Sequence, residues 1–232
     1  GNALRGDLGT SLRHERPVSI LIAERLPVTL SLTILALSLA LLVAIPLGIL
    51  GATHQRTILD YVCLLFAQLG LVLPSFWLGI LLILLLALTW RWLPSGGYIN
   101  WSDDPLQALR HLIMPALALS LPLAGTLARL VRSSMLEELG RDYIRTARAK
   151  GLPERLVLYR HALRNALIPT VTLAGLQISF LLGGSIVIEQ VFALPGLGRL
   201  VLFAIYNRDL PLIQGLVAVS YTHLRAHETG RN

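Results

Sequence analysis

Residues 133–169, SSMLEELGRDYIRTARAKGLPERLVLYRHALRNALIP, hold or adjoin nine of the chain's twenty basic residues and lie between long apolar segments. A first apolar stripe recurs at every fourth position, at Met135, Leu139, Tyr143 and Ala147. Gly151 interrupts the helical period, and Pro153 and Glu154 suit the first turn of a new helix. A second stripe follows at Leu152, Leu156, Tyr159 and Leu163. This pattern predicts two short amphipathic helices joined at a glycine, each with an apolar face for docking.

The composition of the whole chain indicates an integral membrane protein. Of its 232 residues, 54% are hydrophobic and 14% are charged, and the mean hydropathy is +0.66. The net charge of +7 does not favour nucleic-acid binding, because the basic residues gather between apolar segments, as they do in cytoplasmic loops of membrane proteins. Cys63 is the only cysteine, which excludes a disulfide within the chain.

The apolar segments predict four complete membrane spans and part of a fifth. The complete spans are expected at residues 28–52, 59–90, 112–131 and 170–189. Residues 59–90 exceed the length of one upright span, and we interpret them as a single tilted helix kinked at Pro74 rather than as a hairpin. Gly96 then lies outside the membrane and Gly151 inside it. Small residues four positions apart, as at Ala36, Ala40 and Ala44, predict closely packed helix faces.

The pattern divides the chain into three parts. Residues 1–27 form an extracytoplasmic lead-in, and residues 28–219 form the membrane domain, which includes the basic loop at 133–169. The last apolar run stops at Val219, about half the length of a span. Residues 220–232, SYTHLRAHETGRN, depart abruptly in composition, and we interpret them as a non-native tail.

The basic loop also carries a family resemblance. RTARAKG followed by RHALRNALIP resembles the cytoplasmic coupling loop of binding-protein-dependent ABC importer permeases, and most of all the B-type subunit of dipeptide, oligopeptide, nickel and glutathione systems. Ala147 and Gly151 match the general loop pattern. Arg145 stands at its acidic position and Thr146 follows, as in the form that the peptide subfamily takes. RGDLGTSL near the N-terminus and EQVFALPGLG from Glu189 resemble further segments of the same subunit.

The resemblance implies an all-α polytopic membrane protein with the transmembrane-domain fold of type I ABC importers. Its expected function is to translocate peptides or a similar small solute across the bacterial cell (inner) membrane. The implied partners are a homologous second permease, two cytoplasmic ABC ATPases and an extracytoplasmic solute-binding protein. The residues implied to couple to the ATPases are Tyr143, Arg145, Thr146, Ala147, Arg148, Ala149, Lys150, Gly151, His161, Arg164 and Asn165.

The sequence predicts no catalytic chemistry on this chain. Lys150 is the only lysine and is followed by Gly151 and Leu152, so a GxxxxGK[ST] phosphate loop is excluded and ATP is expected on partner subunits. GxSxG and HExxH motifs are also absent, and we predict no metal site and no enzymatic activity.

Three polar residues at membrane depth, Gln68, Gln177 and Ser179, are candidates for lining a solute path. Hydrogen bonds between helices are the alternative explanation for them. For the whole chain, the alternatives are a passive channel and a membrane scaffold. For the basic loop itself, the alternative to docking is a solvated loop held near anionic lipid.

Overall fold

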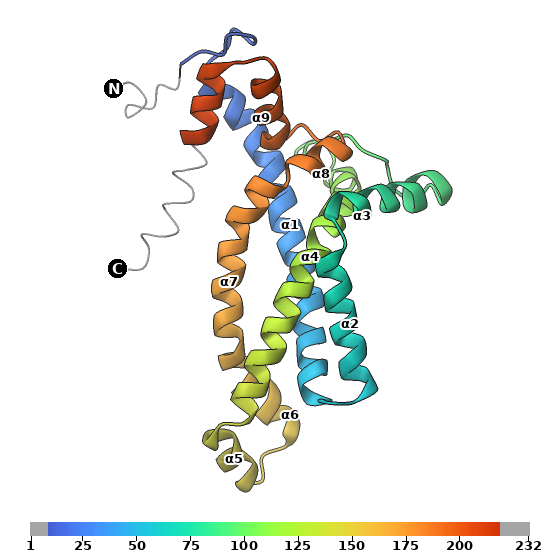
Figure 1. Cartoon of the computed structure of the whole chain (residues 1–232), viewed down its shortest axis with the longest axis vertical. Helices are drawn as coiled ribbons and strands as arrows, with labels where there is room; N and C mark the ends of the chain where they lie inside the picture. Colours follow the sequence, from blue (N-terminus) through green and yellow to red (C-terminus); the bar gives the residue numbers. More distant parts are fainter. Residues whose placement is uncertain (1–8, 219–232) are drawn as a thin grey trace. The chain divides into compact units, whose positions relative to one another are not determined.

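The computed structural model describes residues 9–218, without the side chains of residues 179, 180 and 182–184. In this part of the chain every named element is helical (Figure 1), and an isolated bridge joins Thr10 and Pro17. The predicted all-α fold is confirmed. The proposed tail at 220–232 lies outside the described residues.

The named elements are α1 (Val18–Thr53), α2 (Ile58–Val72), α3 (Ser75–Leu82), η2 (Ile83–Thr89), α4 (Pro105–Leu139), α5 (Asp142–Ala149), α6 (Glu154–Leu156), η3 (Val157–Ala162), α7 (Leu163–Gly184), α8 (Ile186–Val191) and α9 (Leu197–Tyr206).

Two of the described helices are each long and apolar enough to cross a membrane. These are α1, with 36 residues, and α4, with 35. Both extend beyond the predicted spans, since α1 begins at Val18 rather than Val28 and α4 continues to Leu139. Helix α7 has 22 residues and includes Pro169, which was predicted to close the basic loop. At 1.5 Å per residue α7 is about 33 Å long, which matches the thickness of a bilayer core.

The prediction of one tilted helix kinked at Pro74 over residues 59–90 is right about the position of the bend and wrong about its size. The chain forms two helices, Ile58–Val72 and Ser75–Thr89, which are bent by 99° at the break between them. Pro74 has no N–H to continue the helix and disfavours a helical conformation at the residue before it. Leu73 accordingly has extended backbone angles, φ −76° and ψ 123°. The antiparallel hairpin considered as the alternative does not form either.

The chain divides into two compact units, one comprising residues 1–35, 79–116 and 178–232 and the other residues 36–78 and 117–177. In the second unit the helices approach closely through small residues. A Cβ added at Gly70 would lie 2.6 Å from the carbonyl oxygen of Leu121, and one added at Gly48 would lie 2.5 Å from Val131. The predicted small-residue face of α1 is confirmed by the burial of Ala36, Ala40 and Ala44, and in α4 the small residues Ser120, Ala124 and Ala128 are buried at the same four-residue spacing.

A buried ion pair fixes the start of α2 in the same unit. The Arg132 side chain donates to both carboxylate oxygens of Asp60, at 2.7 Å each, and the backbone N–H of Arg56 donates to the same carboxylate at 3.0 Å. The side chain of Asp60 is only 3% exposed. Because Arg132 lies seven residues before Leu139, this pair places the start of α2 on the membrane side that carries the basic loop.

In the first unit a buried carboxylate, Glu189 of α8, joins three helices. It accepts hydrogen bonds from the Thr29 hydroxyl at 2.7 Å, the Ser185 hydroxyl at 3.1 Å and the backbone N–H of Arg199 at 3.0 Å. Glu189 is fully buried, and neutral donors satisfy it. Its contacts tie α1 and α8 to the N-terminus of α9, next to an apolar cluster of Val18, Leu21, Ile22, Leu200, Ala204, Leu212 and Leu216.

We predict that Gly196→Ala destabilises this unit. A Cβ at residue 196 would collide with the carboxylate of Glu189, and overpacking of this kind costs about 1–3 kcal/mol. Thermal unfolding of the purified protein measures the effect. Gly175→Ala is the matched control, because an added Cβ there meets nothing within 4 Å. Equal melting temperatures for the two variants would contradict the packing described at Glu189.

We also predict the membrane orientation from the basic loop. Gly96 is a poor labelling position because a Cβ there would lie 2.5 Å from the carbonyl oxygen of Phe192, whereas Ser95 is exposed. In a Cys63→Ala background, an impermeant thiol reagent applied to intact cells should label Ser95→Cys and leave Ala149→Cys unlabelled until the membrane is opened. Labelling of Ala149→Cys from outside would reverse the orientation.

Candidate functional site

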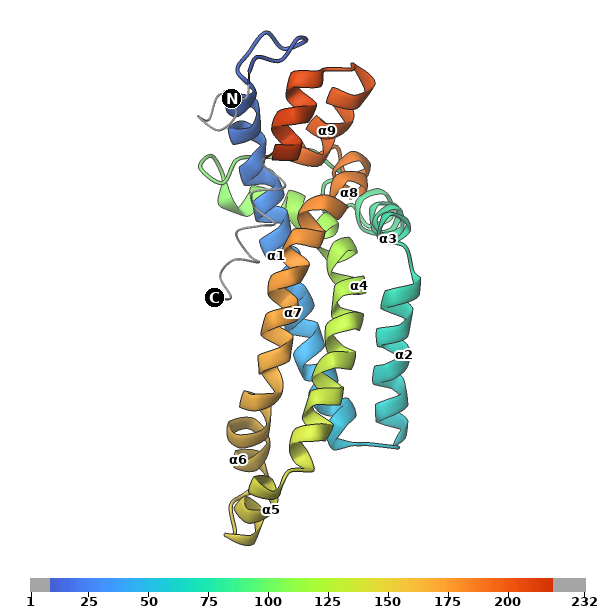
Figure 2. The same ribbon diagram turned by 60° about the vertical axis from the view of Figure 1, so that its left-hand side comes forward.

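The basic loop folds as two short helical pieces joined at Gly151, as predicted. Figures 1 and 2 show α5 and α6 beyond the ends of α4 and α7. Gly151 has φ +76°, in the left-handed region that only glycine adopts freely, and its N–H donates to the carbonyl of Arg148 at 2.9 Å. The backbone at Gly151 therefore sets the direction in which the chain leaves α5.

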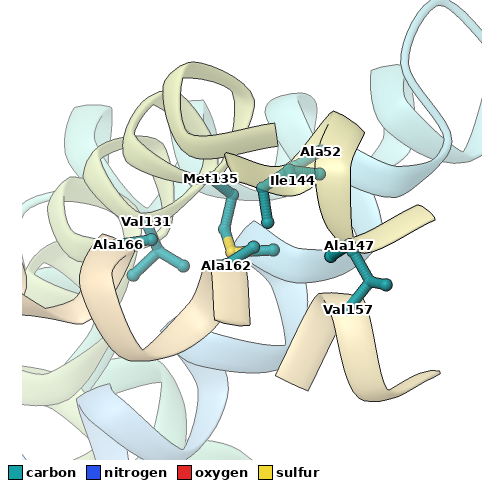
Figure 3. Packing of buried hydrophobic residues seen from close by; sticks show 8 residues of the cluster. All are labelled: Ala52, Val131, Met135, Ile144, Ala147, Val157, Ala162 and Ala166. Carbon is teal, nitrogen blue, oxygen red and sulfur yellow. The ribbon is translucent and has the colours of Figure 1, made fainter. Parts of the chain in front are cut away.

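One face of the loop is buried against the chain itself (Figure 3). A single apolar cluster joins α5, η3 and the ends of α1, α4 and α7, and its members are Ala52, Val131, Met135, Ile144, Ala147, Val157, Ala162 and Ala166. We call this the loop cluster. The inference that the apolar stripes require a partner to bury against is therefore wrong for the buried positions, because they pack on their own unit.

Most members of the predicted stripes face the loop cluster, but the two tyrosines do not. Met135 and Ala147 belong to the cluster, and Leu139, Leu152 and Leu163 pack against it. Tyr143 is 37% exposed and Tyr159 is 59% exposed, whereas Ile144 and Val157 are fully buried. Two features explain the exposure of the tyrosines. The helix breaks near Gly140, so Met135 and Tyr143 belong to different helices, and η3 is a π-helix, so its buried residues Val157 and Ala162 are five positions apart.

The opposite face of the loop is polar and exposed. Its members are Arg145, Thr146, Arg148, Ala149, Lys150 and Gly151, and we call them the outward face. Arg148 donates to both carboxylate oxygens of Glu154, at 3.1 and 2.6 Å, and these bonds together with the charge of Arg148 lower the pKa of Glu154 from its ordinary value. The bidentate pair closes the turn around Gly151 from the solvent side.

The remaining predicted loop residues lie elsewhere. Tyr143, His161, Arg164 and Asn165 line an open hollow of about 510 Å³ together with Arg160 and Ile168. Within it the Asn165 amide donates to the Tyr143 hydroxyl at 3.0 Å, and that hydroxyl donates to Glu138 at 2.5 Å. Burial, followed by the hydrogen bond to Glu138, raises the pKa of Tyr143. The predicted coupling residues thus separate into a buried one, Ala147, an outward face and the lining of a hollow.

The predicted solute-path residues are not brought together with the loop. Gln68 is exposed and Gln177 is half-buried, and neither lines the hollow described above. The Ser179 side chain lies outside the described residues. The path-lining role of these three residues stays a prediction.

Two comparisons define the class of protein. A solved structure of the MetNI methionine ABC transporter in inward-facing conformations superposes with a TM-score of 0.72 at 18% identity, over 90% of this chain and 92% of that one. A solved amino acid ABC transporter with histidines gives a TM-score of 0.65 at 14% identity, over 91% of each chain. The fold is therefore that of a type I ABC importer transmembrane domain, as predicted.

The family follows from the sequence. Residues 44–222 match the binding-protein-dependent transport system inner membrane component, and the chain belongs to this family. It is 50% identical over 214 residues to a Brucella suis protein named provisionally as a peptide transport system permease, covering 92% of this chain and 68% of that one. It is 44% identical over 223 residues to the oligopeptide transport system permease protein AppB of Bacillus subtilis, covering 95% and 71%. The glutathione transport system permease protein GsiC of Salmonella choleraesuis is 44% identical over 216 residues, covering 93% and 68%.

These findings confirm the predicted class. The chain is a permease subunit of the inner membrane and a transport component rather than an enzyme. The family places it in a membrane complex with a partner permease and ATPase subunits.

We predict that Ala147→Asp disrupts the loop cluster. Ala147 is 7% exposed and packs inside the cluster, and an unpaired carboxylate there costs about 3 kcal/mol or more. Ala149→Asp, two residues further along the same helix, is exposed and should stay within about 0.5 kcal/mol of the parent. Limited trypsin cleavage at the loop arginines and thermal unfolding both report the difference. Equal behaviour of the two variants would show that the cluster does not form.

Proposed function

We propose that this chain imports peptides or a similar small solute such as glutathione, and that its outward face transmits the movement of partner ATPases to the membrane helices. The proposed assembly contains a homologous second permease, two cytoplasmic ABC ATPases that bind the ATP, and an extracytoplasmic solute-binding protein. The solute class is supported by the names of the relatives, which are 44–50% identical and belong to peptide, oligopeptide and glutathione systems.

The observation that carries the coupling role is the two-sided construction of α5. Ile144 and Ala147 are buried on one side, while Arg145, Arg148 and Lys150 are exposed on the other. Because the buried side is occupied by the chain's own residues, a partner meets a polar and basic surface rather than an apolar one. A partner with carboxylates or carbonyl groups facing the loop fits this surface best.

Movement can pass from this surface to the membrane helices because the loop cluster connects them. Residues of α1, α4 and α7 all contribute to the cluster, at Ala52, Val131 and Ala166. A close-packed contact of this kind transmits displacement instead of absorbing it. Tilting of α5 by an ATPase would therefore move the ends of these helices together, as in a rigid-body transition.

Gly151 provides the test of this role. Valine at φ +76° is strained by about 1–3 kcal/mol, and because a Cβ at this position meets nothing within 4 Å, the strain acts through the backbone alone. Gly151→Val should therefore reorient the turn and reduce co-purification of the ATPases and transport at least tenfold. Gly151→Asn is the matched control, since asparagine tolerates the left-handed region, and it should retain most of both.

The measurement is made on the complete complex in vesicles, with ATP hydrolysis and solute uptake assayed together. Two results would contradict the proposal. One is a Gly151→Val protein that inserts normally and transports with tight coupling, which would leave a solvated basic loop as the better description. The other is equal loss in the valine and asparagine variants, which would show that the backbone at Gly151 is not the cause.

A further inference from the structure

The segment from Ser75 to Trp92, which follows the break at Pro74, has an unusual composition. Between Asp60 and Arg91 the sequence contains no charged residue, and in α3 and η2 the only hydroxyl side chains stand at the two ends, Ser75 and Thr89. The helix therefore has no polar face to turn toward water.

The rest of the described chain covers only a small part of this helix. Within residues 75–92 only Gly79 is buried. The exposed large apolar side chains of the segment are Phe76, Trp77, Ile80, Leu81, Leu84, Leu85, Leu88, Trp90 and Trp92. A surface of this kind is stable only when it is removed from water.

The length of α2 sets the depth at which the segment begins. The pair between Asp60 and Arg132 holds the start of α2 on the side of the basic loop. Helix α2 has 15 residues and is thus about 22 Å long, whereas the hydrocarbon core is about 30 Å thick. When the chain bends by 99° after Val72, it is still about 8 Å below the opposite boundary of the core. A helix whose axis runs at that depth lies wholly within the core, since the helix is about 10 Å across and its radius is about 5 Å.

Aromatic residues mark both ends of the segment. Trp77 lies in the first turn of α3, and Trp90 and Trp92 follow η2 with their rings 4.6 Å apart. Tryptophan favours both membrane–water interfaces. Because the helix from Ser75 to Thr89 is only about 22 Å long and the core is about 30 Å thick, its two ends fall short of opposite interfaces, and tryptophan at both ends indicates that they lie near the same one. In the first unit Phe192 holds the segment, since a Cβ added at Gly79 would lie 3.0 Å from its ring, and its carbonyl accepts the N–H of Gly97 at 2.9 Å.

We propose that α3 and η2 lie in the plane of the membrane, immersed in the outer leaflet, with their exposed side chains in direct contact with phospholipid acyl chains. The segment binds a lipid surface and does not cross it. This inference concerns the membrane side opposite the outward face, and it does not depend on how the ATPases attach.

Tryptophan quenching by lipids brominated at defined acyl positions measures the depth. Four variants each keep one of Trp77, Trp90, Trp92 and Trp101, with the others changed to phenylalanine, and are reconstituted in the assembly that the protein forms. We expect Trp77 and Trp90 to lie at shallow depths that agree within about 5 Å, although 13 residues of upright helix would separate them by about 20 Å. Trp101, whose indole donates to Ser31 at 3.0 Å in a loop with Asp103 and Asp104, is the control and should be quenched least.

Thiol labelling decides which leaflet holds the far end. In the Cys63→Ala background, an impermeant reagent should reach Arg91→Cys, which follows η2 and is exposed, from outside intact cells. Three outcomes would overturn the proposal. Trp77 near the bilayer centre would indicate a single crossing helix, and labelling of Arg91→Cys only from inside would indicate a hairpin. Absence of quenching at both Trp77 and Trp90 in the assembly, with quenching restored in the isolated subunit, would show that a partner protein covers the segment.

Discussion

Helix packing in the second unit depends on glycines that let neighbouring helices approach closely. Because Gly70 has no side chain, α2 can lie against the carbonyl of Leu121. In the same way, Gly48 lets α1 lie against the side chain of Val131. Apolar side chains gain little from one another inside a bilayer, so association depends on such contacts and on buried polar pairs. The bidentate pair between Asp60 and Arg132 supplies the polar contribution and defines where α2 begins. The loop cluster then rests on the ends of helices that are already fixed.

This construction gives the basic loop two separate tasks. Its apolar residues hold α5 and η3 on the membrane domain, and its charged residues remain available to a partner. Ala147 of α5 and Ala162 of η3 are both buried in the loop cluster, where a larger side chain would overpack it. A partner surface need not be hydrophobic, because the apolar residues Ile144 and Ala147 of α5 are already covered by the chain itself.

Much of this could be read from sequence because it depends on local chemistry. The period of the small residues predicted the buried helix faces, and Gly151 predicted the turn because no other residue adopts its backbone angles freely. The prediction of which loop residues are buried was less successful, because it depends on the helical turn staying regular from one residue to the next. The break at Gly140 and the π-helical turn of η3 each changed the phase, so Ile144 rather than Tyr143 is buried. The pair between Asp60 and Arg132 joins residues 72 positions apart, and its only signal was a lone carboxylate beginning an apolar run.

The outward face has a chemical property that follows from composition and fold together. Lys150 is the chain's single lysine, and it is exposed beside the turn at Gly151. Reagents that acylate side-chain amines can therefore modify the chain only at Lys150, and a mass shift on the peptide that contains Lys150 measures the accessibility of this one position. Protection of that amine in the assembled transporter, and its release when the subunits separate, would provide a direct footprint of occupancy at the turn without any engineered residue.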